Sequence, residues 1–127
     1  MEKRIYYHDT DSGGVVYYGN YLKYLEEART EFLEQKGLSV QRLREYGFLY
    51  AVRECRIIYR APARYGDIIL CDCALNKITA AQLFFDQRII LKAAKILLAE
   101  AQVTLVSLNA DFKPVAIPKT CTDAINS

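Results

Sequence analysis

The sequence lacks any long apolar segment. Its first residues, MEKRIYYHDT, contain no apolar run of signal-peptide length, and no later segment approaches the roughly twenty uninterrupted apolar residues that a transmembrane helix needs. The sequence therefore predicts a cytoplasmic protein without membrane insertion.

Histidine and closely paired cysteines are also scarce. The chain has one histidine, His8, and its four cysteines form no CxxC pair, so we expect neither a zinc site nor, in a reducing compartment, a disulfide. Cys71 and Cys73 alternate along a predicted strand and share one face of it. Free cysteines in such positions are usually small buried apolar side chains, and we expect both in the core.

There is little excess charge of either sign. Seventeen lysines and arginines against fifteen acidic residues leave a net charge of +2, which does not indicate nucleic acid as a partner. The composition, 52% hydrophobic and 25% charged, is that of an ordinary globular protein. We find no internal repeat, linker or low-complexity segment, and the length predicts a single domain over residues 1–127.

A helical pattern begins at Asn20. Apolar residues recur there at steps of three and four positions, with lysine and glutamate between them, as in an amphipathic helix. We expect Asn20 to be the N-cap and Gly37 to end the helix. A second, shorter helix is expected over residues 40–46.

Most of the remaining chain favours strands. They are predicted at residues 4–7, 48–59, 68–76, 81–91 and 95–108, with the turn APARYGD between the second and the third, and the segment after Asn109 is expected to be irregular. One long helix against an antiparallel sheet of about five strands is an α+β architecture.

Some of these strands are apolar on both faces. The runs Ile89–Leu91 and Ile96–Leu98 suit strands that are covered on both sides. A single helix covers only one face of a sheet. We therefore expect a second subunit on the other face or at the sheet edge.

The loop DTDSGGVVYYGN precedes the long helix and gathers chemically useful groups. The start of a helix offers unpaired backbone N–H groups and a partial positive charge, and glycines such as Gly13 and Gly14 let the backbone pass close to a ligand. Asp11 can act as a base or a nucleophile. Judged by residue type alone, however, an aspartate in such a loop is more often a turn former.

The segment YYHDTDSGGVVYYGNYLKYLEEARTEFL, residues 6–33, resembles the hotdog-fold thioesterases. This family includes 4-hydroxybenzoyl-CoA thioesterase and the short-chain acyl-CoA thioesterases associated with the Tol-Pal system. The match is densest over DTDSGGVVYYGNY, and APARYGD and the closing KPVAIPK also look like the family's turn and tail, so the resemblance spans nearly the whole chain.

The resemblance implies an enzyme that hydrolyses short-chain or aromatic acyl-CoA thioesters without a cofactor. It also implies a homodimer, or a homotetramer made of two dimers, with acyl-CoA as the partner molecule. By this resemblance Asp11 is the nucleophile or general base, and the backbone N–H of Tyr18 polarises the thioester carbonyl. The remaining substrate-binding candidates are Gly14, Val15, Tyr17, Asn20 and Tyr21.

Basic residues are expected near the mouth of the site because CoA carries phosphates. The candidates are Arg60, Arg64, Arg88, Lys113 and Lys119, and a solvated surface charge is the alternative role of each. The tyrosines of the helix start, among them Tyr24, can line an acyl pocket or pack in the core.

One position bears on the substrate, and two other functions remain open. Many Tol-Pal associated relatives have histidine where this chain has Tyr18, whereas the 4-hydroxybenzoyl-CoA enzymes have tyrosine there. A hotdog dehydratase or hydratase is one alternative, but it relies on a histidine with a carboxylate, and His8 lies before the loop. A noncatalytic acyl-thioester binding protein is the other, and it has no need of Asp11.

Overall fold

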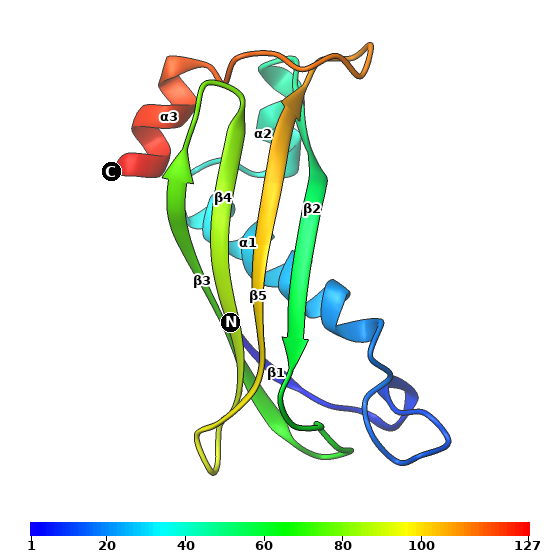
Figure 1. Cartoon of the computed structure of the whole chain (residues 1–127). Coiled ribbons are helices and arrows are strands. Elements are labelled where there is room, and N and C mark those ends of the chain that lie inside the picture. Colours follow the sequence, from blue (N-terminus) through cyan, green and yellow to red (C-terminus); the bar gives the residue numbers. More distant parts are fainter.

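A curved antiparallel sheet wraps around one long helix in the computed structural model, which describes residues 1–127 (Figure 1). The elements follow one another as β1 (Glu2–Arg4), a 3-10 turn η1 (Tyr7–Asp9), α1 (Asn20–Gln35), α2 (Val40–Glu45), β2 (Leu49–Tyr59), β3 (Ile68–Ile78), β4 (Gln82–Leu91), β5 (Ile96–Leu108) and α3 (Lys119–Asn126). The expectation of an α+β chain with about five antiparallel strands is confirmed.

The sheet has the strand order β1-β3-β4-β5-β2. Strands β3, β4 and β5 follow one another as neighbours, whereas β2 pairs with β5 and occupies one edge. A register shift between Val52 and Glu54 marks a bulge in β2. Because β2 is an edge strand, the backbone groups on its outer side are unpaired within the chain.

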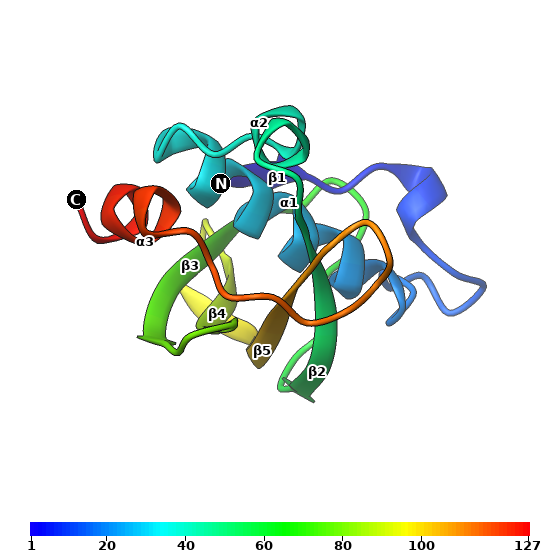
Figure 2. The ribbon, with the colours of Figure 1, turned by 90° about the horizontal axis from the view of Figure 1, so that it is seen from above.

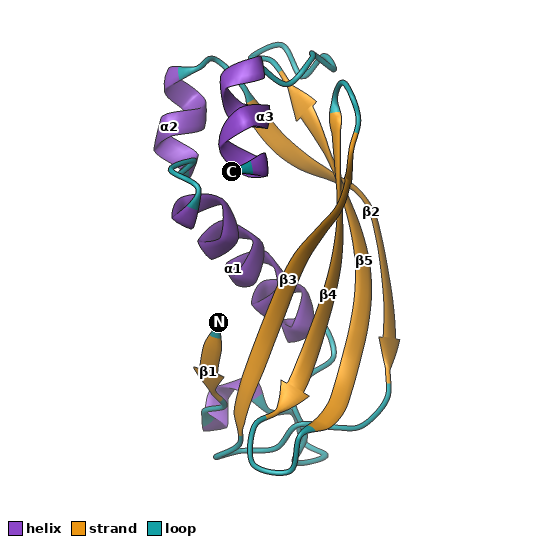
Figure 3. Cartoon of the chain, turned by 90° about the vertical axis from the view of Figure 1, so that its left-hand side faces the viewer, coloured by secondary structure: helices purple, strands orange, loops and turns teal.

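All three helices lie on one side of the sheet, as Figure 3 shows. Seen from above in Figure 2, the sheet curves around α1. Tyr24, Leu25 and Ala28 of α1 are buried against this face, together with Phe85 of β4 and Val103 of β5. This arrangement explains the apolar spacing of the helix, because one face of α1 fills the concave side of the sheet.

The opposite face of the sheet is uncovered within the chain. Along β4, Leu83, Phe85, Gln87 and Ile89 are buried, while the residues between them are more exposed. One chain thus covers one face of the central strands. None of its helices is both long enough and apolar enough to cross a membrane.

Two sequence predictions about the ends of the fold are wrong. The first strand runs over Glu2–Arg4 and pairs with β3, instead of over residues 4–7. Tyr7 already begins a 3-10 turn, and the N–H of Tyr6 just before it donates to the carboxylate of Asp9 instead of to a neighbouring strand. The segment after Asn109 is not irregular throughout, since it ends in α3. That helix forms because Cys121 and Ile125 are buried against the core.

The other boundaries agree closely with the prediction. The second helix is confirmed, and Gly37 follows the end of α1 with a φ of 79°, in the left-handed region that glycine adopts without strain. Cys71 is fully buried, as expected, while Cys73 is only partly buried.

Candidate active site

The loop between η1 and α1 is closed by its own backbone. The N–H of Asp11 donates to the carbonyl of Val15 at 2.9 Å, and the N–H of Gly14 donates to the carbonyl of Asp11 at 3.0 Å. Gly14 has a φ of 80°, a conformation that residues with a Cβ rarely adopt. The glycine is therefore required by the turn that follows Asp11.

The end of this loop is docked on the APARYGD turn. The N–H of Val16 donates to the carbonyl of Ala63 at 2.8 Å, and Val15 forms an isolated bridge with Arg64. The side chain of Val16 is buried. Segments that are far apart in the sequence thus hold the loop in one position.

Asp9 anchors the loop to the start of α1. Its backbone carbonyl accepts hydrogen bonds from the N–H of Tyr17 at 3.0 Å and from the side-chain amide of Asn20 at 2.9 Å. Its carboxylate is buried and accepts the N–H of Tyr6 at 2.8 Å. Burial and this carboxylate raise the pKa of the Tyr24 phenol, which therefore stays neutral.

The role of Asn20 differs from the one expected. Gly19 is the N-cap of α1 and Asn20 is its first residue, so the prediction of an Asn20 N-cap is wrong. The Asn20 amide instead reaches back to Asp9, because a donor group finds a carbonyl there. Asn20 still fixes the helix start, but through the preceding loop.

Two N–H groups immediately before the first residue of α1 are free. Among the hydrogen bonds of the chain, none uses the N–H of Tyr18 or of Gly19 as a donor. The carbonyl of Tyr18 accepts the hydroxyl of Tyr59 at 3.2 Å. Unpaired N–H groups at a helix start, where the helix dipole is positive, favour an anion or a polarised carbonyl oxygen.

The carboxylate of Asp11 is exposed to solvent and only partly engaged. One oxygen, Oδ1, accepts the N–H of Gly13 at 2.8 Å, which is the turn-forming contact expected of an aspartate in such a loop. The other oxygen has no partner in the chain. Asp11 therefore forms the turn and still presents a free carboxylate oxygen.

A shallow depression of about 310 Å³ lies beside Tyr18. Its wall includes Val16, the exposed ring of Tyr18 and the buried ring of Tyr21. The hydroxyl of Tyr21 accepts a hydrogen bond from the N–H of Ala63. Burial raises the pKa of the Tyr21 phenol. Tyr24, in contrast, is fully buried in the core. Of the expected aromatic cluster, Tyr18 and Tyr21 line the depression, Tyr17 packs its ring on Tyr18, and Tyr24 does not reach it.

The five basic candidates do not gather in one place. Arg60 lines the depression and is paired with Glu100, and Arg64 borders the loop through its bridge to Val15. Arg88 is paired with Asp72 on the sheet. Lys113 lies between β5 and α3, and Lys119 begins α3. Figure 1 shows α3 and the segment before it at the end of the molecule opposite the loop, so one chain does not bring these two lysines to it.

His8 stays outside this constellation. Its side chain is exposed, stacks on Tyr6 and lies 3.8 Å from the Asp9 carboxylate. No three histidine, cysteine, aspartate or glutamate side chains of the chain come together as a metal site would require.

Sequence reasoning missed Asp9 and Tyr59. Both hold the backbone on either side of the free N–H groups. Tyr59 is far from the loop in the sequence, and no local pattern indicates its contact. Asp9 stands three residues after Tyr6, the spacing of a capping box, and this spacing is the one sequence signal for its role.

Comparisons with known proteins give one consistent result. A family model described as the thioesterase-like superfamily matches residues 6–125. The chain is 39% identical to the acyl-CoA thioester hydrolase YbgC of Escherichia coli, over 92% of this chain and 87% of the other. It is 35% identical to the acyl-CoA thioesterase YbgC of Haemophilus influenzae, over 91% and 85%. The solved 1,4-dihydroxy-2-naphthoyl-CoA thioesterase of Synechocystis superposes with a TM-score of 0.91 at 29% identity, covering 100% of this chain and 94% of that one.

Proposed function

The chain belongs to the thioesterase-like superfamily, and we propose that it is an acyl-CoA thioester hydrolase, which releases a free acid and CoA. The observation that carries this proposal is the pair of free N–H groups of Tyr18 and Gly19, in the same loop as the exposed carboxylate of Asp11. Hydrolysis of a thioester needs both parts, a base or nucleophile and donors for the developing oxyanion.

The backbone donors act on the thioester carbonyl. A carbonyl oxygen bound to the N–H of Tyr18 gains negative charge as the tetrahedral species forms, and the positive end of α1 stabilises that charge. The hydroxyl of Tyr59 and the Asp9 carbonyl fix the backbone on both sides of this N–H. The donor is therefore in place before the reaction begins.

Asp11 supplies the other part in one of two ways. As a nucleophile, its free oxygen forms a bond to the carbonyl carbon, the carbon–sulfur bond breaks, CoA leaves as a thiolate that takes up a proton, and water cleaves the resulting anhydride. As a general base, Asp11 takes a proton from water, the hydroxide adds to the carbon, and the proton passes to the leaving thiolate. Rapid acid quenching followed by mass spectrometry separates the two, since only the first gives a protein carrying the acyl group.

Short-chain or aromatic acyl groups are the proposed substrates. The depression beside Tyr18 has apolar and aromatic walls from Val16, Tyr21 and Tyr59, which suit a small apolar group. Gly14, Val15, Tyr17 and Asn20 do not line the depression but are neighbours in sequence of the lining residues Val16 and Tyr18, and we assign them to the substrate-binding loop. We assign the CoA phosphates to Arg60 and Arg64, the basic candidates at the depression and at the loop. A panel of acyl-CoA thioesters, with release of free thiol as the readout, tests the acyl range.

Replacing Asp11 by asparagine is the decisive test of the mechanism. Asparagine keeps the size and the contact to the Gly13 N–H but cannot act as a base or carboxylate nucleophile, so we expect turnover to fall by about a hundredfold to ten-thousandfold. The Michaelis constant should change far less. Thermal unfolding and binding of a nonhydrolysable CoA analogue serve as controls. Normal turnover in a folded Asp11→Asn protein would refute the mechanism, and a wild-type protein that binds but hydrolyses no thioester would favour a noncatalytic binding protein.

A homodimer is the proposed assembly, with two dimers forming a tetramer. The outer edge of β2 is unpaired, its Val52 and Ile58 are exposed, and the face of the sheet away from the helices is bare. Light scattering at micromolar concentration tests this assembly. A fully active monomer would contradict it.

We also propose that the enzyme acts in the cytoplasm. All four cysteines are free thiols, as is usual in a reducing compartment. Cell fractionation with an antibody to the protein tests this, and recovery in a membrane or extracellular fraction would contradict it.

A further inference from the structure

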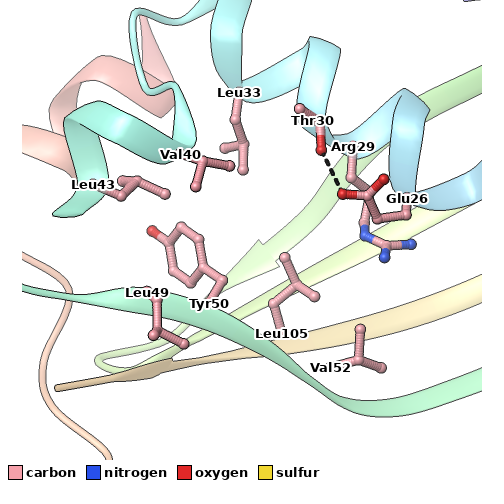
Figure 4. A pocket seen from close by; sticks show the side chains of 10 residues that line it. All are labelled: Glu26, Arg29, Thr30, Leu33, Val40, Leu43, Leu49, Tyr50, Val52 and Leu105. Carbon is pink, nitrogen blue, oxygen red and sulfur yellow. Dashed lines mark hydrogen bonds between the residues drawn. The ribbon is translucent and has the colours of Figure 1, made fainter. Parts of the chain in front are cut away.

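A second cavity lies away from the active-site loop, between α1, α2 and the edge of the sheet. We call it the α1–α2 cavity; its volume is about 180 Å³, and seven of its ten lining residues are hydrophobic. Leu33, Leu43 and Leu105 form part of the wall, as Figure 4 shows. Val40 and Val52 also line it and are about half exposed. Because Val52 lies on the β2 edge that the proposed dimer covers, the cavity opens to solvent beside Val40.

One charged side chain stands in this apolar wall. Arg29 of α1 is only 7% exposed, and its guanidinium points from the helix toward the sheet (Figure 4). Its Nη1 donates to Oε1 of the buried Gln87 at 3.1 Å, and Nε2 of Gln87 donates to the carbonyl of Leu25 at 3.0 Å. These bonds fix the guanidinium in one orientation.

Arg29 has no acidic partner. It takes part in none of the ion pairs of the chain. The nearby carboxylate of Glu26 instead accepts the hydroxyl of Thr30 at 3.0 Å. Burial lowers the pKa of Arg29, which reflects the cost of keeping its charge away from water. A buried cation without an anionic partner lowers the free energy of unfolding, and a bound anion would offset this loss.

The free nitrogens of Arg29 are accessible from the cavity. Nε and Nη2 donate to no acceptor of the chain, yet they are not among its fully enclosed unpaired polar atoms. A small ligand can therefore reach them. A guanidinium edge with free N–H groups matches the two oxygens of a carboxylate better than a single carbonyl oxygen.

We propose that the α1–α2 cavity binds the anion of a short-chain carboxylic acid, with its carboxylate on Arg29 and its hydrocarbon chain on the apolar wall. A cavity of about 150 Å³ holds a benzene molecule, so the volume of about 180 Å³ has room for an acid of about four to six carbons. The charge of Arg29 selects the head group, and the leucines select the tail.

The carboxylate can come from two sources, which share this chemistry. One is a free acid, the product class of the proposed hydrolysis, and the other is the far end of a dicarboxylic acyl group. The inference does not depend on the proposed function, because it concerns binding and not turnover. Free butyrate tests the first source directly, and glutarate tests whether a second carboxylate adds affinity.

Calorimetric titration of the full chain with sodium butyrate is the experiment. We expect butyrate to bind at least tenfold more tightly than butyramide, its neutral counterpart. Arg29→Met should weaken butyrate binding by tenfold to a hundredfold, the range for charge-assisted hydrogen bonds. Arg56→Met is the matched control, because Arg56 is exposed and paired with Glu54. The Arg56→Met protein should bind butyrate with the same affinity as the wild type.

A second variant keeps the test decisive if Arg29→Met does not fold. Glu26→Gln removes a neighbouring negative charge at an exposed position and should tighten butyrate binding several-fold. Asp11→Asn should bind butyrate as the wild type does, so a failed hydrolysis test leaves this result intact. Equal affinity for butyrate and butyramide would overturn the proposal. A change in oligomeric state in Arg29→Met, with no butyrate binding to the wild type, would also overturn it and would assign Arg29 to a carboxylate of a second copy.

Discussion

Two aspartates, two positions apart, occupy opposite environments in the active-site loop. Asp9 is buried; its carboxylate accepts the backbone N–H of Tyr6, and its carbonyl accepts the backbone N–H of Tyr17 and the side-chain amide of Asn20. Asp11 is exposed and keeps one oxygen free. The first residue therefore positions the helix start, and the second is available for chemistry.

The backbone of Tyr18, and not its side chain, is the proposed oxyanion donor. Tyr18→Phe leaves that N–H and the carbonyl contact with Tyr59 unchanged and removes only the phenol hydroxyl, so we expect it to retain most of the activity. Tyr18→Pro removes the N–H and should be inactive, although no hydrogen bond within the chain is lost. Steady-state hydrolysis measures both.

Circular dichroism of the two Tyr18 variants is the control for folding. A loss beyond about a hundredfold in Tyr18→Phe, comparable to removal of an oxyanion donor, would give the phenol a direct part in the reaction. Full activity in Tyr18→Pro would exclude the backbone donor.

How far the site could be predicted depends on the range of its contacts. Asp11, Gly14 and Tyr18 lie in one short loop, and their spacing before a helix was enough to single them out. Tyr59 contacts Tyr18 from a distant strand, and no local pattern announces such a pair. The assignment of Asn20 as a cap failed because the choice between capping and reaching back to Asp9 depends on where the preceding loop is docked.

At the scale of elements, α1 was predictable and α3 was not, for one physical reason. The 16 residues of α1 carry enough apolar positions for their period to be read from the sequence. The 8 residues of α3 include two threonines and an asparagine, which are weak helix formers. Tertiary burial of Cys121 and Ile125 stabilises α3, and that contribution is not local.

Ile125 tests whether α3 is part of the core. It is 3% exposed, so Ile125→Ala should lower the free energy of unfolding by about 2 kcal/mol or more. Urea unfolding measures this loss. The matched control is Asp123→Ala in the same helix, where removal of the exposed pair with Lys119 should cost less than about 1 kcal/mol. Equal losses in the two variants would show that α3 does not pack as described.

At the scale of the whole molecule, the outer edge of β2 has no pairing strand within one chain. Ile58 lies on this strand and is about half exposed. Ile58→Lys should therefore leave the chain folded while its charge opposes pairing along the edge, and we expect at least a tenfold rise in the dimer dissociation constant. Sedimentation velocity measures the change.

Ile96→Lys is the control for Ile58→Lys, because Ile96 is similarly exposed but lies on a central strand. That variant should assemble like the wild type. Should only Ile96→Lys dissociate, the interface would lie at the β4–β5 end of the sheet instead of along β2.

The pairing of β2 with β5 also determines the order in which parts of the chain fold. Leu49 pairs with Leu108 and Tyr59 with Ala99, so β2 cannot pair until β5, the third strand after it in the sequence, has formed. Closing so long a loop has a large entropic cost, and pairings of this kind slow folding. Since Tyr59 reaches Tyr18 only from a docked β2, the oxyanion donor should be fixed among the last events of folding. In refolding from urea, hydrolysis should then return later than helical circular dichroism; simultaneous recovery would show that the site forms with the helix.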